Sequence, residues 1–380
     1  MLMKYRLFTP GPTSVPEATL LQLAKPVTHH RTAEFRKTFA ELQELLKYVF
    51  QTQQTVYTIT GSGTAAFEAA FTSVVSPGSK VLNVTNGKFA ERWASYGKAF
   101  GVQVEELKLP YGQHATAEQI NNTLKSGGFA AVVLVHSETS TATTCDLQAI
   151  AKVVRQHGDV LLIVDGITSI GAFPFKFDDW GIDVAITGSQ KSLMLPPGLG
   201  YVCLSPRAEA AMEKNKQSNF YFDLKKYKKS IADSDTPFTP ANTLIEAQLT
   251  SLRMIKQETI EGVWRRTQGC AAAFRAGVKA LGLELFSQTP ADSVTAVKYP
   301  SGITDKDFRN TLKKDHNIHV AGGQGTMEGT IFRVNHMGYT DIYDCLAVLA
   351  AIELTLKKLG KPVQLGAGIS AAQQELSKLF

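Results

Sequence analysis

The sequence predicts an α/β protein: a mostly parallel sheet with helices on both faces, followed by a smaller α+β part. Up to residue 205, short apolar runs alternate with helical stretches, which is the rhythm of βαβ units. Several runs are apolar on both faces, as strands must be when helices cover both sides of a sheet. After residue 281 the composition changes, and only three further strand-like runs follow.

Seven apolar runs predict the strands of the large sheet. They are residues 55–60, 80–86, 103–109, 130–138, 160–166, 184–189 and 200–205. Helical patterns separate most of them, at residues 64–75, 89–100, 115–126 and 146–157. Only the Pro/Gly loop "QKSLMLPPGL" joins the last two runs. We expect that pair to be antiparallel, because a parallel pair needs a longer crossover.

We expect three parts along the chain. Residues 1–15 include "FTPGPTSVP", and because proline fixes φ, this segment is expected to lie extended over another surface. Residues 16–260 form the predicted large domain, with a helix over 33–50, and residues 261–380 the predicted small domain. A single long helix is expected over 241–281. The small domain is expected to contain strands at 293–300, 317–322 and 330–338, helices at 304–315 and 340–359, and a closing surface helix or loose tail.

The composition is that of an ordinary globular protein, with 44% hydrophobic and 19% charged residues. The net charge of +6 is mild, and its densest basic run, residues 225–229, is expected to be a solvated helix face, so we expect no nucleic-acid partner. Four scattered cysteines and eight histidines show no metal-ligand spacing, so we expect reduced thiols and no metal. No run resembles a membrane span or a signal peptide, which predicts a cytoplasmic protein with no membrane partner.

A glycine-rich turn follows the first predicted strand, in "TVYTITGSGTAAFEAAF", residues 55–71. Such a turn holds a phosphate against the N–H groups of a helix N-terminus. It fits the relaxed dinucleotide pattern G-x-G-x-x-A, or equally the seat of a single cofactor phosphate. The dinucleotide interpretation requires an acidic residue near the end of the second strand. Asn83 and Asn86 stand there instead, which weakens it.

Two charged residues follow neighbouring apolar strands: Asp165 ends "VLLIVDG", and Lys191 follows "VAITGS". In an open parallel sheet, ligands bind outside the carboxyl ends of the strands. Pyridoxal phosphate needs a lysine that binds it covalently and an acid that keeps its pyridine nitrogen protonated. Taken singly, Asp165 is as well explained as a helix cap, and Lys191 as an exposed loop residue. Together with a phosphate turn they favour a pyridoxal phosphate site.

The chain resembles the class V aminotransferases of fold type I, in the alanine–glyoxylate and serine–pyruvate branch. The resemblance runs nearly end to end, through "FTPGPTSVP", "HHRTAEFR", "TGSGTAAFEAA", "NGKFAERW", "VHSETST", "VDGITSIGA", "GSQKSLMLPPG" and "FRVNHMG". It implies a large domain with a seven-stranded sheet and a small C-terminal domain. It also implies ping-pong transfer of an amino group from a small amino acid (alanine, serine or aspartate) to a 2-oxo acid such as glyoxylate or pyruvate.

The resemblance implies a set of contacts to pyridoxal phosphate. They are Ser62, Gly63, Thr64 and Gln190 at the phosphate, Phe89 and Ile167 on the two faces of the ring, Thr139 at the phenolic oxygen, Asp165 at the pyridine nitrogen, Lys191 as the covalent and catalytic residue, and Thr239 at the cofactor of the other subunit. The last contact implies a homodimer with shared active sites.

Three residues are implied on the substrate side. Arg333 matches the arginine that grips the substrate α-carboxylate, and an arginine inside the apolar strand "TIFRVNH" is poorly explained as a surface charge. Gly11 and Arg31 complete the set. Arg31, in "HHRTAEF", is either a contact to a substrate side-chain carboxylate, which would favour aspartate, or a structural arginine.

The sequence departs from the family pattern at three positions. Ala142 stands where the family usually has glycine, and Ser137 where it often has asparagine or glycine. Either change is expected to reshape the loop beside the cofactor. A tyrosine common before the phosphate-binding threonine of the partner subunit has no clear counterpart, and Thr236 is the nearest match. The sequence therefore leaves open how tightly the chain binds the cofactor phosphate and which substrates it takes.

Two alternatives remain open from the sequence. One is another class V reaction, a lyase or a cysteine desulfurase, and the latter needs a thiolate on a mobile loop. No cysteine lies between Cys270 and Cys345, and Cys345 falls in a helical pattern, which disfavours a desulfurase. The other alternative is a cofactor-binding subunit without turnover.

Overall fold

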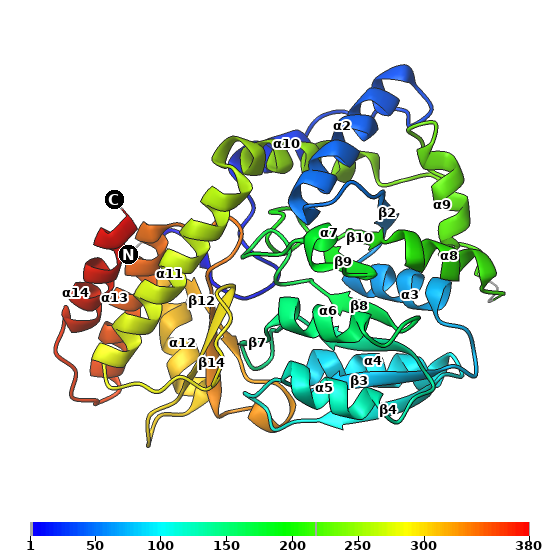
Figure 1. Cartoon of the computed structure of the whole chain (residues 1–380). Coiled ribbons are helices and arrows are strands. Elements are labelled where there is room, and N and C mark those ends of the chain that lie inside the picture. Colours follow the sequence, from blue (N-terminus) through cyan, green and yellow to red (C-terminus); the bar gives the residue numbers. More distant parts are fainter. Residues whose placement is uncertain (1–2, 217–218, 380) are drawn as a thin grey trace.

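A seven-stranded sheet forms the centre of the structure, a computed structural model that describes residues 3–216 and 219–379 (Figure 1). Its strands are, in spatial order, β2 (Val56–Thr60), β10 (Leu199–Leu204), β9 (Val184–Gly188), β8 (Leu161–Asp165), β5 (Phe129–Val135), β3 (Lys80–Thr85) and β4 (Gln103–Lys108). The strand β10 is antiparallel to both of its neighbours, and the other pairings are parallel. The predicted mostly parallel sheet and its antiparallel last pair are confirmed.

Helices cover both faces of this sheet, and alternate strand residues face opposite layers. In β8, Leu162 and Val164 belong to one apolar cluster and Leu161 and Ile163 to the other, as the two-residue period of a strand requires. The first cluster includes residues of α2 (Ala33–Phe50), α5 (Ala117–Leu124), α6 (Leu147–Arg155), α7 (Phe177–Trp180) and α10 (Asn242–Glu258). The second includes residues of α3 (Gly63–Val74), α4 (Lys88–Ala99), α8 (Pro206–Lys214) and α9 (Leu224–Ile231).

The C-terminal part has its own sheet and its own apolar cluster. The strands are β11 (Val294–Lys298), β14 (Ile331–Asn335) and β13 (Ala321–Gly322), which pair antiparallel. The helices are α11 (Ile260–Ala280), α12 (Asp305–His316), α13 (Ile342–Lys358) and α14 (Ala367–Leu376). In Figure 1, α11, α13 and α14 lie on the left, away from the large sheet. The α+β character is confirmed, and the division into domains stays a prediction.

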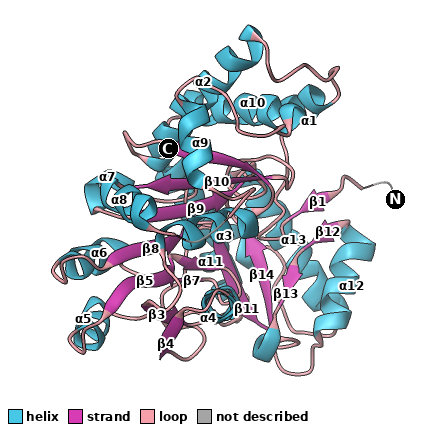
Figure 2. Ribbon diagram, turned by 90° about the vertical axis from the view of Figure 1, so that its right-hand side faces the viewer, coloured by secondary structure: helices cyan, strands magenta, loops and turns pink. Residues whose placement is uncertain are grey.

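The N-terminal segment connects the two sheets. Its strand β1 (Arg6–Leu7) pairs in parallel with β12 (Ile318–His319), as Figure 2 shows on its right side. The amide of Asn335, at the end of β14, donates to the carbonyl of Phe8 at 2.9 Å. Farther along, the amide of Thr13 donates to the carbonyl of Gln190 at 3.1 Å. The short helix α1 (Glu17–Leu23) follows. This segment therefore contacts both the end of β14 and the loop after β9.

The prediction of one long helix over 241–281 is wrong, because two helices occupy this range. The chain breaks at Thr259, whose φ of +70° is outside the helical region. The Thr259 hydroxyl then accepts the amide of Gly262 at 3.1 Å and caps α11. Apolar spacing continues across the break, so periodicity does not reveal it. The tail forms α14 and a 3₁₀ turn, Ser377–Leu379, while its last residue, Phe380, lies outside the described residues.

Candidate active site

One cavity lies at the carboxyl ends of the parallel strands. It is lined by every cofactor residue expected from this chain: Ser62, Gly63, Thr64, Phe89, Thr139, Asp165, Ile167, Gln190 and Lys191. Six further residues complete the lining, namely Phe67, Arg92, Tyr96, Val135, Ser137 and Thr168. Parallel strands bring their carboxyl ends to one edge. Residues far apart in the sequence therefore meet in this cavity.

The N-terminus of α3 forms the wall of the cavity that suits a phosphate. Ser62 is the N-cap, and its side chain makes no hydrogen bond to the helix. A Cβ on Gly63 would lie 2.7 Å from the Ile167 side chain, so any larger residue there would require Ile167 to shift. The Oε1 of Gln190 is buried with no hydrogen-bond partner among the described residues. The free N–H groups of this helix end fit an anionic ligand, whereas the amide oxygen of Gln190 is an acceptor and does not.

Asp165 is the last residue of β8, and only 5% of its surface is exposed. Burial raises its pKa to about 6, while the amide of Ile167, which donates to its Oδ1 at 2.9 Å, lowers it. The nearby charge of Glu138 raises the pKa further. A buried carboxylate of this kind gains strongly from a cationic partner. Asp165 is therefore suited to hold a proton on a ring nitrogen.

Lys191 follows β9, the neighbour of β8, and 8% of its surface is exposed. Its Nζ donates to the carbonyl of Pro10 at 2.7 Å. Burial lowers its pKa to about 8; the charge of Arg333 lowers it too, and that of Asp165 opposes. A Cβ on Gly11 would lie 1.8 Å from Nζ, which explains a glycine there. A larger fraction of this amine is therefore neutral at physiological pH than for an ordinary lysine, and the neutral form is the one that acts as a nucleophile or base.

Arg333 lies in the middle of β14, and 4% of its surface is exposed. Its guanidinium donates to the carbonyl of Gly322 from Nε and Nη2, at 3.0 and 2.7 Å, and to that of Thr139 from Nη1, at 2.9 Å. Burial lowers its pKa to about 10. Arg333 is not part of the cavity lining, so its role at the substrate carboxylate stays a prediction.

Glu138 is a buried carboxylate that sequence reasoning missed. The run expected as one strand over 130–138 turns after β5, and Glu138 falls in the two-residue strand β6 (Ser137–Glu138), which pairs with β7 (Thr143–Thr144). Its carboxylate accepts the amides of Ala90 at 2.9 Å and Phe89 at 3.4 Å. It also accepts the Ser140 amide at 3.0 Å and hydroxyl at 2.6 Å. Glu138 thereby holds the start of α4, which carries Phe89, against the loop that carries Thr139.

The loop after Glu138 shows where the departures from the family pattern fall. The Thr139 hydroxyl contacts that of Thr168 at 3.0 Å, and Thr168 donates to the carbonyl of Ser137 at 2.9 Å. The Ser137 hydroxyl contacts that of Ser293 at 3.1 Å, which ties the loop to the start of β11. Buried Ala142 has a φ of +56°, the left-handed region that favours glycine. The alanine therefore keeps the conformation a glycine would adopt.

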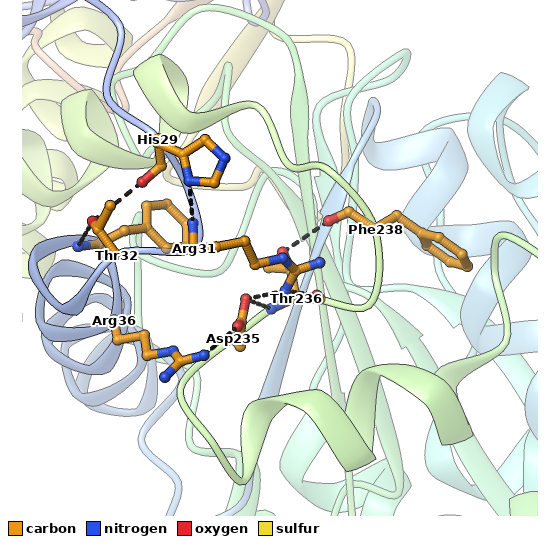
Figure 3. Close-up of polar contacts among 8 residues, drawn as sticks. His29, Arg31, Thr32, Arg36, Asp235, Thr236 and Phe238 are labelled. Atoms are coloured by element: carbon orange, nitrogen blue, oxygen red, sulfur yellow. Dashed lines mark hydrogen bonds and ion pairs between the residues drawn. The ribbon is translucent and has the colours of Figure 1, made fainter.

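Arg31 belongs to a polar cluster away from the cavity lining (Figure 3). It donates to the Asp235 carboxylate at 2.5 Å and to the carbonyl of Thr236 at 2.8 Å. Arg36, on α2, reaches the same carboxylate at 3.2 Å. Thr239 is exposed three residues beyond Thr236 and does not line the cavity of its own chain. Within this chain Arg31 thus ties down the loop that carries Thr239, and its role at a substrate stays a prediction.

The four cysteines are free thiols, and none lines the cavity. Burial raises the pKa of Cys270 to about 12 and also raises that of Cys145, Cys203 and Cys345. Within residues 3–216 and 219–379, no group of three or more His, Cys, Asp or Glu side chains is placed to hold a metal ion. None of the helices in the described part of the chain combines the length and apolarity that a membrane crossing requires.

The fold and the cavity define an enzyme that uses pyridoxal phosphate, because a buried lysine and a buried acid meet beside a helix end that suits a phosphate. Residues 7–340 match the family Aminotransferase class-V. The chain belongs to the class V aminotransferase family and is a fold type I, pyridoxal phosphate-dependent aminotransferase.

Three similar proteins illustrate this membership. The chain is 42% identical to the soluble hydrogenase 42 kDa subunit of Anabaena cylindrica, over 98% of this chain and 99% of that protein. It is 34% identical to the L-aspartate–glyoxylate aminotransferase of Paracoccus denitrificans, over 97% and 95% of the two chains. The solved ureidoglycine–glyoxylate aminotransferase of Bacillus subtilis superposes with a TM-score of 0.92 at 30% identity, over 99% of both chains.

The lowered pKa of Lys191 predicts how the apoprotein captures its cofactor. Only the neutral amine attacks an aldehyde, so attachment of pyridoxal phosphate should accelerate as pH rises to about 8 and then level off. The rate is measured by borohydride trapping and mass spectrometry, with Lys191→Ala as the blank. Nα-acetyl-lysine, whose amine has a pKa of about 10.4, should still accelerate above that pH. A protein rate that keeps rising in parallel with the free lysine would refute the buried-amine explanation.

The bonds of Glu138 predict a loss of stability when its charge is removed. In Glu138→Gln the new amide group faces N–H donors, and buried donors are left unsatisfied. The free energy of unfolding should fall by about 1–3 kcal/mol, measured by urea denaturation of the apoprotein. Glu91→Gln is the control, because Glu91 lies on the same helix in a half-exposed ion pair with Lys88. Equal effects of the two variants would contradict the role assigned to Glu138.

Proposed function

We propose that this aminotransferase moves the amino group of a small amino acid (alanine, serine or aspartate) to a 2-oxo acid such as glyoxylate or pyruvate, by a ping-pong mechanism. The observation that carries the proposal is the meeting of Lys191 and Asp165 in one cavity with the N-terminus of α3. The similarity to enzymes named for glyoxylate supports the acceptor class.

The cavity residues fit pyridoxal phosphate, so we assign each a part. Ser62, Gly63, Thr64 and Gln190 hold the phosphate, Phe89 and Ile167 enclose the ring, and Thr139 binds the phenolic oxygen. When bound, the cofactor supplies an electron sink for the charge that develops at the substrate Cα. Asp165 keeps the ring nitrogen protonated. Lys191 binds the cofactor, and its amine then moves the Cα proton, for which a pKa near 8 is suited.

The substrate side rests on residues outside the large sheet. Arg333 is proposed to bind the α-carboxylate, and its place beside the Thr139 carbonyl and its effect on the pKa of Lys191 support this. Gly11 leaves room beside the Lys191 amine, since any side chain there would occupy its position. Arg31 is already neutralised by Asp235 within the chain, which favours its structural role over a substrate contact.

We further propose a homodimer in the cytoplasm. Thr239 is exposed on a loop that the Arg31–Asp235 pair fixes, which supports a contact to the cofactor phosphate of the partner subunit. Four free thiols support a reducing compartment. The division into an N-terminal segment, a large domain (16–260) and a small domain (261–380) is proposed on the separate apolar cluster of the C-terminal part.

Replacing Lys191 tests the proposed function directly. Lys191→Ala should abolish turnover and the visible absorbance of the lysine-bound cofactor, because no other amine replaces it. Half-reactions of the wild-type protein with alanine, serine and aspartate, followed by the loss of that absorbance, then identify the amino donor. Lys176→Ala, at an exposed lysine, is the control. Full activity in Lys191→Ala would end the proposal.

A subunit without turnover is the second candidate, because one similar protein is named as a hydrogenase subunit. The same measurement separates the two candidates. A protein that binds pyridoxal phosphate at Lys191 but reacts with no amino acid in the half-reaction panel would be such a subunit. Reaction with any one of the three donors would exclude it.

The assignment of Arg333 predicts weaker carboxylate binding in its variants. Arg333→Ala should lose about 2–5 kcal/mol of carboxylate binding, seen as a lower kcat/KM for every amino donor. Arg333→Lys keeps the charge but loses the planar fork, so it should recover only part of this loss. Arg253→Ala, which breaks an exposed pair with Glu41, is the control. An unchanged kcat/KM in a folded Arg333→Ala protein would show that the α-carboxylate binds elsewhere.

A further inference from the structure

Arg92 is a cation of the cavity lining that has no part in the proposed mechanism. It lies on α4 one turn after Phe89, and its guanidinium carbon is 4.8 Å from the centroid of the Phe89 ring. Its charge is near enough to lower the pKa of Lys191. Arg92 is exposed, and among residues 3–216 and 219–379 its side chain has no ion-pair or hydrogen-bond partner.

Two acids near Arg92 are engaged elsewhere. The next residue along the chain, Glu91, pairs with Lys88 at 2.7 Å and accepts a hydrogen bond from Tyr111. The carboxylate of Glu138 is occupied by amides of α4 and by Ser140. Arg92 therefore differs from Arg31, which sequence reasoning proposed for a second substrate carboxylate but which Asp235 neutralises.

An un-neutralised guanidinium over an aromatic ring is available to bind an oxyanion. The ring restricts the planar group through a cation–π contact, and its N–H donors match the spacing of carboxylate or phosphate oxygens. We propose that Arg92 binds an oxyanion in this site, either a phosphate oxygen of the cofactor or the second carboxylate of a dicarboxylic amino donor. The proposal rests on the proposed function for the identity of these two anions.

Arg92→Met tests the proposal, because methionine keeps an apolar chain over the Phe89 ring and removes the charge. The matched control is Lys98→Met, which removes one exposed cation from the same helix outside the cavity lining. Arg92→Lys keeps the charge without the fork. Each variant is compared with the wild type in two equilibrium titrations and in its sedimentation behaviour.

The first titration measures binding of pyridoxal phosphate and of pyridoxal, which lacks the phosphate, to the apoprotein. If Arg92 contacts the phosphate, Arg92→Met weakens the affinity for pyridoxal phosphate by about 10- to 100-fold and leaves the affinity for pyridoxal unchanged. This arm needs no turnover, so it remains informative even when the Lys191 experiment rejects transamination.

The second titration measures binding of maleate, a dicarboxylate, and of acetate to the cofactor-loaded protein by their effect on its absorbance. If Arg92 contacts a second carboxylate, Arg92→Met weakens the affinity for maleate by about 10- to 100-fold and leaves the affinity for acetate unchanged. Arg92→Lys should lie between wild type and Arg92→Met in whichever arm responds. The proposal is overturned if Arg92→Met leaves the affinities for all four ligands unchanged, or if it changes only the association of subunits.

Discussion

The hydrogen bond from the Lys191 amine to the carbonyl of Pro10 links the cavity to the N-terminal segment. A buried amine is costly unless its protons are accepted, and this acceptor comes from a segment that is remote in the sequence. The same segment pairs with β12 and accepts the amide of Asn335 from the end of β14. The surroundings of a residue at the edge of the large sheet therefore depend on how the small sheet is attached.

A second constraint is the balance of buried charge beside this bond. Asp165 and Glu138 are buried carboxylates, and Lys191 and Arg333 are buried cations. Each influences the pKa of another: Arg333 lowers that of Lys191, and Glu138 raises that of Asp165. Removing one charge leaves its neighbours uncompensated in a medium of low polarity. Only Glu138 among them is held by backbone amides of α4, so it fixes the geometry as well as the charge.

Local patterns predict the strands and the edge of the site but not the contacts across the fold. Buried strands are continuous apolar runs, so β8 and β9 are visible in the sequence, and Asp165 and Lys191 follow from their ends. Thr259 interrupts a helix without interrupting its apolar spacing, so the break is invisible to periodicity. Glu138 stands in the quoted motif "HSETST", yet its role depends on α4, whose amides it meets only in the fold.

The same limit explains why sequence reasoning named Arg31 and passed over Arg92. A cation is available to a ligand only when no acid of the protein neutralises it, and that depends on a partner far away in the sequence. Arg31 meets Asp235 across 204 residues, so its charge is used within the chain. The charge of Arg92 faces the cavity while its sequence neighbour Glu91 turns to Lys88 and Tyr111. The groups proposed to carry the chemistry thus lie at strand ends, where sequence patterns find them. Which charges remain available to a ligand depends on the fold, because the fold determines which of them an acid or a base of the protein pairs.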